Sequence, residues 1–259
     1  GGASSELAAV AGSKMAANGI LVTGGTGFVG GHFLSALLER RDSSVPVFCL
    51  VRIRNHTAVD AADRARARLE KIMRERFALS ACWDDAGMAD RIIALPITSI
   101  ADPKLGLASD ADWQRLREKV GTVVHLAARV AFWDEYAEAR SANVLGTLEI
   151  LRFCCAPSGG VRPFLHYAST LSVFGALPGE CSEGSSIGKT AALSGVVGSE
   201  GYSQSKWVGE KLVVKASASL SIPAAIHRIG YVSFSTKTGV ANRNGWFHKL
   251  LVGCARAGY

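Results

Sequence analysis

Tyr202 and Lys206 stand four positions apart in the stretch EGYSQSKWVGEKLV. If this stretch is helical, the two side chains lie on one face, because residues four apart are neighbours on an α-helix. A free tyrosine, with a pKa of about 10, transfers protons poorly at neutral pH. A neighbouring ammonium group stabilises the phenolate, so this pair is suited to acid–base chemistry on a substrate oxygen.

A third catalytic residue is expected at the end of the preceding strand, in the stretch FLHYASTLSVFG. This stretch contains Ser169, Thr170 and Ser172. The ends of parallel strands face the ligand crevice, where a hydroxyl can bind a substrate oxygen. We select Thr170, with Ser169 as the alternative that caps the turn. Two histidines, His125 and His166, are rival bases, but both lie in apolar stretches, which predicts buried core histidines.

Glycines interrupt the stretch ILVTGGTGFVGGHFLSALLER, which covers residues 20–40. Its apolar start predicts a buried strand, and the apolar spacing from Phe28 onward predicts a helix. A T-G-x-x-G-x-x-G turn between a strand and a helix is typical of a dinucleotide site, where the pyrophosphate binds backbone N–H groups. Gly24 would allow the tight turn, Gly27 the approach of phosphate, and Gly30 close helix–sheet packing. We expect cofactor contacts from Thr23, Gly24, Thr26, Gly27, Phe28 and Val29.

The end of the second apolar stretch, LVRIRN, indicates which dinucleotide is bound. Sites that prefer NAD place an acidic residue there to bind the ribose 2′-hydroxyl. This chain has Arg52 and Arg54 instead. A guanidinium can bind a 2′-phosphate through two hydrogen bonds, whereas a carboxylate would repel it. We therefore predict that NADPH is the cofactor and that Arg52 and Arg54 bind it, with Arg64 as a third candidate.

Apolar runs alternate with helical patterns along the chain. The predicted strands span residues 19–23, 47–51, 91–95, 121–127, 162–169 and 223–229. The predicted helices span residues 28–40, 58–76, 111–118, 143–155, 203–217 and 246–257. The strands are continuously apolar, which is typical of a parallel sheet buried on both faces. This alternation predicts an α/β fold, a Rossmann-type doubly wound parallel sheet with strand order 3-2-1-4-5-6.

Other strand ends should complete the cofactor site. Ala127 and Ala128 follow the fourth predicted strand, and Ile229 ends the sixth. Because the carboxyl ends of parallel strands meet at one edge of the sheet, we expect these residues to contact the cofactor together with Tyr202 and Lys206.

Composition narrows the class of protein. The chain has 259 residues, of which 48% are hydrophobic, enough for one large α/β domain or two small ones. No apolar run approaches the ~20 residues of a membrane span. The first 18 residues lack a basic start and a sustained apolar stretch, which argues against a secretory signal. We expect residues 1–18 to be a linker or the edge of a piece from a longer polypeptide, and the protein to be cytoplasmic.

Basic residues outnumber acidic ones, for a net charge of +7. Many of them lie in RARARLEKIMRER, residues 64–76, where no aromatic residues are interleaved. This pattern predicts a solvated helix face rather than a nucleic-acid surface. The positive charge suits an anionic cofactor or an acidic carrier partner. The six cysteines form no C-x-x-C pair, and we predict no metal site.

Several motifs together resemble the extended short-chain dehydrogenase/reductases: the glycine turn, VVHLAA (123–128), NVLGT (143–147), HYASTLSVFG (166–175) and GYSQSKWVGEKL (201–212). More narrowly, CLVR, DPKLGL (102–107) and HRIGYVSFSTKTGVANRNGWF are similar to thioester reductase domains. Such domains terminate nonribosomal peptide synthetases, polyketide synthases, and carboxylic acid and aminoadipate reductases. The likeness runs from about residue 19 to the last residue.

The resemblance implies that an acyl thioester, held on the phosphopantetheine arm of a carrier domain, is reduced to an aldehyde or further to an alcohol. It also implies NADPH as the reductant and a place within a larger multidomain enzyme. Thr170, Tyr202 and Lys206 match the family's catalytic triad, and Arg52 matches its 2′-phosphate reader. Residues 19–259 would then be the NADP-binding Rossmann domain of a thioester reductase.

The chain departs from the family pattern at three places. Thr98-Ser99 replaces the usual Gly-Asp, whose Asp approaches adenine, and Arg228-Ile229-Gly230 replaces the usual Arg-Pro-Gly. Family members continue beyond the position of Tyr259 into a substrate-binding region. We therefore expect most of that region to be missing, and this piece to bind NADPH but to reduce carrier-bound thioesters poorly. One wall of the acyl site is expected from Trp246, Phe247, Leu250, Leu251 and Val252.

Two rival functions share parts of this pattern. A nucleotide-sugar epimerase or dehydratase of the same superfamily has the triad and the fold, but it usually has an acidic residue where Arg52 stands. A non-catalytic regulator that senses a dinucleotide has no need for a Tyr–Lys pair. The fold by itself does not separate the three functions.

Overall fold

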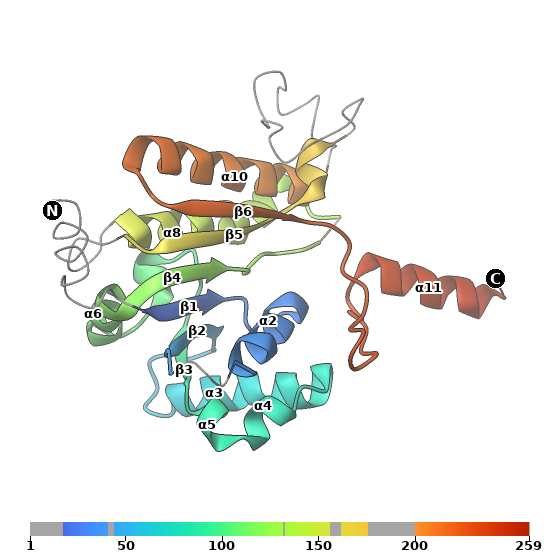
Figure 1. Ribbon diagram of the computed structural model, residues 1–259. Helices are drawn as coiled ribbons and strands as arrows, with labels where there is room; N and C mark the ends of the chain where they lie inside the picture. The colour runs from blue at the N-terminus through green and yellow to red at the C-terminus, as the bar shows by residue number, and fades with distance from the viewer. Residues whose placement is uncertain (1–17, 41–43, 132, 156–161, 176–199, 259) are drawn as a thin grey trace, which may run out of the picture.

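A computed structural model describes residues 18–40, 44–131, 133–155, 162–175 and 200–258 (Figure 1). Apart from Asn18, the expected linker over residues 1–18 lies outside these ranges. The described chain forms one parallel sheet in the order β3-β2-β1-β4-β5-β6. Its strands are β1 (Gly19–Thr23), β2 (Val47–Arg52), β3 (Ile92–Ile97), β4 (Val120–His125), β5 (Phe164–Thr170) and β6 (Ala224–Ile229). The predicted Rossmann-type doubly wound sheet and its strand order are confirmed.

All six predicted helices are present. The last has the predicted bounds and the other five have shifted ends: α2 (Phe28–Leu38), α3 (Ala61–Lys71), α6 (Asp110–Lys119), α8 (Gly146–Cys155), α10 (Gly201–Leu220) and α11 (Trp246–Ala257). Two π-helical turns, η1 (Ile72–Arg76) and η3 (Ser141–Leu145), adjoin α3 and α8. The helical pattern does not predict the short helices α4 (Ala81–Asp84), α5 (Ala86–Ala89) and α7 (Tyr136–Arg140), because so few residues show no period. Two 3₁₀ turns, η2 (Pro103–Gly106) and η4 (Leu171–Phe174), follow β3 and β5.

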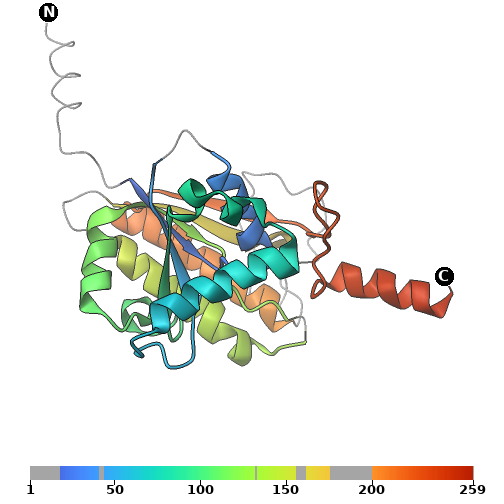
Figure 2. The same ribbon diagram turned by 90° about the horizontal axis from the view of Figure 1, so that it is seen from below.

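The sheet lies between two layers of helices (Figures 1 and 2). It separates two clusters of buried hydrophobic residues, one on each face. Right-handed crossovers place α2 and α3 on one face and α6, α8 and α10 on the other. Successive side chains of a strand point to opposite faces. In β1, Leu21 therefore packs in the core beside α6, α8 and α10, and Val22 in the core beside α2 and α3. Both side chains have no exposed surface.

The apolar strands predict a sheet that is buried on both faces, but part of one face is open. On the α2 side of β5 and β6, His166, Ala168, His227 and Ile229 line a cavity of about 520 Å³. Every residue of β6 keeps some exposed surface. The prediction that His166 is a buried core histidine is therefore wrong, because its ring is partly exposed and its Nδ1 lies 3.0 Å from Nε2 of His227. His125 is buried, as predicted.

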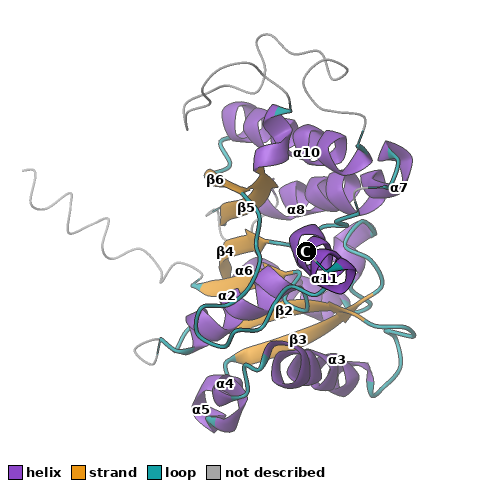
Figure 3. Cartoon of the chain, turned by 90° about the vertical axis from the view of Figure 1, so that its right-hand side faces the viewer, coloured by secondary structure: helices purple, strands orange, loops and turns teal. Residues whose placement is uncertain are grey.

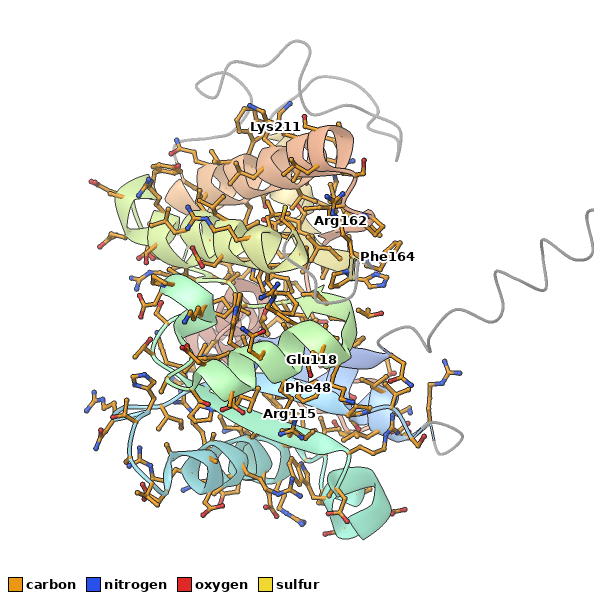
Figure 4. All side chains as sticks on the ribbon, turned by 90° about the vertical axis from the view of Figure 1, so that its left-hand side faces the viewer. Phe48, Arg115, Glu118, Arg162, Phe164 and Lys211 are labelled. Atoms are coloured by element: carbon orange, nitrogen blue, oxygen red, sulfur yellow. The ribbon has the colours of Figure 1, made fainter. Side chains whose placement is uncertain are left out.

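The basic residues of α3 are only partly a solvated face. The guanidinium of Arg66 is half-buried, donates to the carbonyl oxygens of Ile92 and Ala89, and lies over the Trp83 ring. On the other face of the sheet, Arg115 of α6 lies with its guanidinium carbon 5.4 Å from the ring centroid of Phe48 (Figure 4). Arginines here stabilise the fold through carbonyls and aromatic rings, which the prediction of a solvated face misses.

The last helix, α11, projects from the body of the molecule beyond the carboxyl ends of the strands (Figures 1 and 2). None of its residues is buried. No helix in the described part of the chain combines the length and the apolar character needed to cross a membrane.

Candidate active site

The glycine turn after β1 depends on two very close backbone approaches. Gly24 has a φ of +74°, and a Cβ there would lie 2.6 Å from the backbone nitrogen of Ala127. A Cβ at Gly30 would lie 2.1 Å from the carbonyl oxygen of Gly24. Gly24 therefore allows the tight turn, as predicted. Gly30 instead brings α2 against the turn itself, which corrects the expected helix–sheet contact.

The N-terminus of α2 has the properties of an anion site. Gly27 is exposed, and the only heavy atom outside its neighbours within 4 Å of a Cβ there would be the carbonyl oxygen of Gly24, at 3.1 Å. No side chain caps α2, and its first turn holds no acidic residue. The backbone N–H groups and positive dipole end of such a helix favour a phosphate.

The loop after β2 presents two guanidinium groups to solvent. Arg52 and Arg54 are exposed, and among the residues that the structure describes neither forms an ion pair. Their carbonyl oxygens are bound by arginines of α3: Arg68 donates to Arg52, and Nη2 of Arg64 donates to Arg54 at 2.5 Å and to Asn55 at 3.0 Å. Arg64 therefore anchors the loop, which leaves Arg52 and Arg54 as the free cations there.

The three residues selected for catalysis meet in a cavity of about 340 Å³ at the carboxyl ends of the strands, the side of the molecule that Figure 3 faces. Tyr202 and Lys206 project from α10, and Thr170 ends β5. The side chains of Tyr202 and Thr170 are hydrogen-bonded. Burial raises the pKa of Tyr202, and the bond from Thr170 opposes this shift.

Lys206 is buried and points at the end of β5. Its Nζ donates to the carbonyl oxygen of Ala168 at 2.6 Å and lies 4.2 Å from the ring centroid of Tyr167. Burial lowers the pKa of Lys206 to about 7, and the charge of Glu210 opposes this shift. An amine poised in this way can change charge with small changes in its surroundings.

The alternative residue Ser169 does not cap the turn after β5. Its hydroxyl donates to Oε2 of Glu210 at 2.5 Å. The cap is Thr170, whose Oγ1 accepts the backbone N–H of Ser172 at 3.2 Å. The structure thus favours Thr170 over Ser169 as the hydroxyl that is directed into the cavity beside Tyr202.

The remaining predicted cofactor residues divide into two groups. Val29, Ala128 and Ile229 line the same cavity as Tyr202 and Lys206. Thr23, Thr26 and Phe28 lie at the glycine turn. The backbone N–H of Ala127 donates to Oγ1 of Thr23 at 3.1 Å and so joins the ends of β4 and β1.

The apolar wall expected from α11 is shorter than predicted. Trp246 and Phe247 line the cavity. Leu250 and Leu251, which are 44% and 50% exposed, and Val252 do not. At the other end of the site, Thr98 donates to Asp102 at 2.6 Å and Ser99 Oγ accepts the backbone N–H of Ala101 at 3.2 Å.

Sequence reasoning assigns no role to two buried polar residues behind the cavity. Nδ2 of Asn143 donates to Ser205 Oγ at 2.8 Å and to the Arg129 carbonyl oxygen at 3.0 Å. Asn143 thereby joins the loop after β4 to α10. The second residue, Glu210, lies one helical turn beyond Lys206, and this spacing is a signal that the sequence already contains.

A family model of NAD-binding domains, described as male sterility protein (NAD_binding_4), matches residues 22–259. The chain belongs to this family. Its cofactor is therefore a nicotinamide dinucleotide. The glycine turn, the uncapped α2 and the cavity beside Tyr202 fit such a cofactor, because they offer free N–H groups to phosphates and polar side chains to the other end.

Two relatives confirm the resemblance to thioester reductase domains. The terminal R domain of the myxalamid PKS-NRPS pathway is 36% identical, with a TM-score of 0.77 over 94% of this chain and 56% of that chain. Aldehyde reductase lnbA of Aspergillus flavus is 33% identical over 238 residues, which cover 91% of this chain and 22% of that protein. The chain thus spans about half of the solved R domain and about a fifth of lnbA.

A more distant likeness shows the fold alone. A variant of UDP-glucuronic acid 4-epimerase from Bacillus cereus is 20% identical, with a TM-score of 0.60 over 92% of this chain and 63% of that chain. The present chain and the epimerase therefore share a doubly wound sheet. The function of the chain must be argued from its site.

Proposed function

We propose that this domain reduces an acyl thioester, carried on the phosphopantetheine arm of a carrier domain, to an aldehyde at the expense of NADPH. The observation that carries the proposal is the meeting of Thr170, Tyr202 and Lys206 with Trp246 and Phe247 in one cavity. The hydroxyls suit a carbonyl oxygen, and the aromatic side chains suit an acyl chain. The R-domain relative at 36% identity supports the same reaction class.

The residues of the cavity have separate tasks. Bound NADPH supplies the hydride to the carbonyl carbon of the thioester. Tyr202 and Thr170 donate hydrogen bonds to the carbonyl oxygen as its negative charge develops. Tyr202 then gives its proton to this oxygen, and Lys206, held by the Ala168 carbonyl, stabilises the phenolate that remains. Collapse of the hemithioacetal releases the carrier thiol and the aldehyde.

The preference for NADPH rests on the loop after β2. Arg52 and Arg54 are exposed and form no ion pair among the described residues, and the loop between β2 and α3 holds no acidic residue until Asp60. A free guanidinium gains more from a 2′-phosphate than one already paired to a carboxylate. Because Arg64 and Arg68 hold the carbonyls of this loop, its cations need little reordering to bind.

Residues 19–259 are proposed to act as the NADP-binding domain of a longer enzyme that also contains or recruits the carrier. The much greater length of lnbA supports this arrangement. A net charge of +7 suits the phosphates of the cofactor and of the phosphopantetheine arm.

The test measures NADPH oxidation by the 259-residue chain with an acyl-pantetheine thioester and with the same acyl group on a carrier protein. Thioester-dependent oxidation with aldehyde as product supports the proposal. Isomerisation of a UDP-sugar without consumption of NADPH would indicate the epimerase rival. Tight NADPH binding with neither turnover would indicate a regulator.

A further inference from the structure

Glu210 is a carboxylate with no exposed surface, one helical turn beyond Lys206 on α10. Ser169 donates to its Oε2 at 2.5 Å, and Arg228 donates to its Oε1 from Nη2 at 2.6 Å and from Nε at 3.0 Å. A buried carboxylate is costly unless it is paired and hydrogen-bonded, and these three bonds meet that need. Its partners come from β5 and β6, so three elements meet at one side chain.

Both partners of Glu210 stand next to residues of the catalytic cavity. Ser169 itself lines the cavity and precedes Thr170, and Arg228 precedes Ile229, which also lines the cavity. The guanidinium carbon of Arg228 also lies 4.8 Å from the ring centroid of Phe174, the last residue of η4. A shift of the Glu210 carboxylate would therefore move both segments that bear on the substrate side of the cavity.

Glu210 also acts on Lys206 through its charge. The carboxylates on the helices packed against α10 are Glu138 on α7 and Glu149 on α8, which accept bonds from the Glu135 backbone N–H and from Arg152. The groups that act on Lys206 by charge or contact are Glu210 on α10, Tyr167 on β5 and His125 on β4. Burial lowers the pKa of His125 to about 3, so this ring is neutral at pH 7. Among these groups Glu210 is the carboxylate, and its charge opposes the loss of the ammonium form that burial favours.

We propose that Glu210 is a positioning residue of this active site, whose carboxylate anchors the ends of β5 and β6 and places a fixed negative charge beside Lys206. The inference rests on the proposed function, because it takes Lys206 and Tyr202 as the acid–base pair. Anchoring sets the geometry of Thr170, and the charge favours the ammonium form of Lys206. Glu210 itself touches no substrate atom.

The first experiment measures the effect of the Glu210 charge on Lys206 and needs no enzymatic turnover. The cofactor-free chain is labelled with [ε-¹³C]lysine, and the Lys206 resonance, identified by its loss in Lys206→Met, is titrated by NMR. In Glu210→Gln the titration midpoint of Lys206 should fall by roughly one pH unit or more, the size expected on loss of a nearby opposite charge. The matched control is Glu149→Gln, because Glu149 is also a buried carboxylate paired with an arginine, Arg152, but lies on α8 outside the cavity.

The second experiment reads the pH dependence of kcat with an acyl-pantetheine thioester. Removal of a negative charge lowers the pKa of Lys206, so the alkaline limb of the kcat–pH profile of Glu210→Gln should move to lower pH. Glu210→Asp keeps the charge but has a shorter side chain. Its kcat should therefore fall several-fold, while the alkaline limb of its kcat–pH profile stays at the same pH as in the parent. If Glu210 served folding alone, its substitution would shift neither the alkaline limb of the kcat–pH profile nor the NMR titration midpoint of Lys206.

A Lys206 midpoint in Glu210→Gln equal to that of the parent would overturn the charge role, and a parental kcat in Glu210→Asp would overturn the anchoring role. If Glu210→Gln does not fold, the double variant Glu210→Gln/Arg228→Met removes the whole ion pair, a change that buried pairs often tolerate. Its Lys206 midpoint should still fall, but by less than in Glu210→Gln, because loss of the Arg228 cation offsets part of the loss of the carboxylate. If the parent chain reduces no thioester, the proposed function fails, and the NMR titration still decides the role of Glu210.

Discussion

Oγ1 of Thr23, at the end of β1, lies 2.7 Å from Nδ1 of His125, at the end of β4. The same oxygen accepts the N–H of Ala127, so its proton is directed to Nδ1. The other ring nitrogen, Nε2, then carries the proton and faces Oγ1 of Thr147 at 3.3 Å. A neutral histidine therefore joins the strand before the glycine turn to the strand that bears Ala127 and Ala128.

His125→Phe should lower the free energy of unfolding by about 1–3 kcal/mol, because it removes the acceptor for the buried Thr23 hydroxyl proton and the second bond of the Thr147 hydroxyl. The measurement is urea denaturation followed by circular dichroism. The matched control is His166→Phe, whose partly exposed ring can exchange its bond for water. Equal losses in the two variants would contradict a special role for His125.

Tyr202→Phe should lower kcat by about 10²–10⁴-fold, the usual worth of a general acid, while NADPH binding stays nearly intact. Only the hydroxyl that reaches the reacting oxygen is removed. Steady-state kinetics and a fluorescence titration with NADPH separate the two effects. More than about a tenth of the parental turnover would show that another group donates the proton.

The parent chain should bind NADPH at least about tenfold more tightly than NADH, since a charge-assisted pair at the 2′-phosphate contributes on this scale. Arg52→Asp should narrow or invert the ratio, because it places a carboxylate at the free end of the loop. Arg256→Asp makes the same charge change on the projecting helix α11 and should leave the ratio unchanged. Equal affinities of the parent chain for NADPH and NADH would contradict this prediction.

Lys206 should also shape the dependence of stability on pH. The folded chain has a Lys206 pKa of about 7 against 10.5 for the exposed group, so between these values the unfolded chain binds more protons. Stability therefore gains from this group as pH rises from about 7 to 10.5, and burial of the ammonium is a full cost below pH 7. Lys206→Met should raise Tm at pH 6 and abolish activity. A Tm of Lys206→Met at pH 6 below that of the parent would contradict a destabilising effect of the buried Lys206 ammonium.

Gly24→Ala should abolish cofactor binding and destabilise the domain, because a Cβ there meets the backbone of Ala127 at a φ of +74°. Gly253→Ala is the matched control, since nothing lies within 4 Å of a Cβ there and alanine favours a helix over glycine by about 1 kcal/mol. The two variants should shift Tm in opposite directions. Thermal unfolding and NADPH titration of both proteins provide the check.

The sequence by itself determined the doubly wound sheet, its strand order and the places of Thr170, Tyr202 and Lys206. These features follow from local information: apolar runs define buried strands, the glycine turn marks a strand-to-helix junction, and a spacing of four residues puts two side chains on one helix face. The carboxyl ends of parallel strands share one edge, so residues far apart along the chain could be expected there together.

Only the tertiary structure decided what depends on contacts between distant elements. The hydroxyl of Ser169 bonds to Glu210 instead of capping its own turn, because α10 brings a carboxylate over the end of β5. Arg64 donates to the backbone carbonyl oxygens of Arg54 and Asn55, so its guanidinium is not a free cation. The rings of His125 and His166 both lie on apolar strands, but a helix covers one face of the sheet there and a cavity lies on the other. A strand pattern shows that a side chain points to a face, and the packing of other elements decides what that face meets.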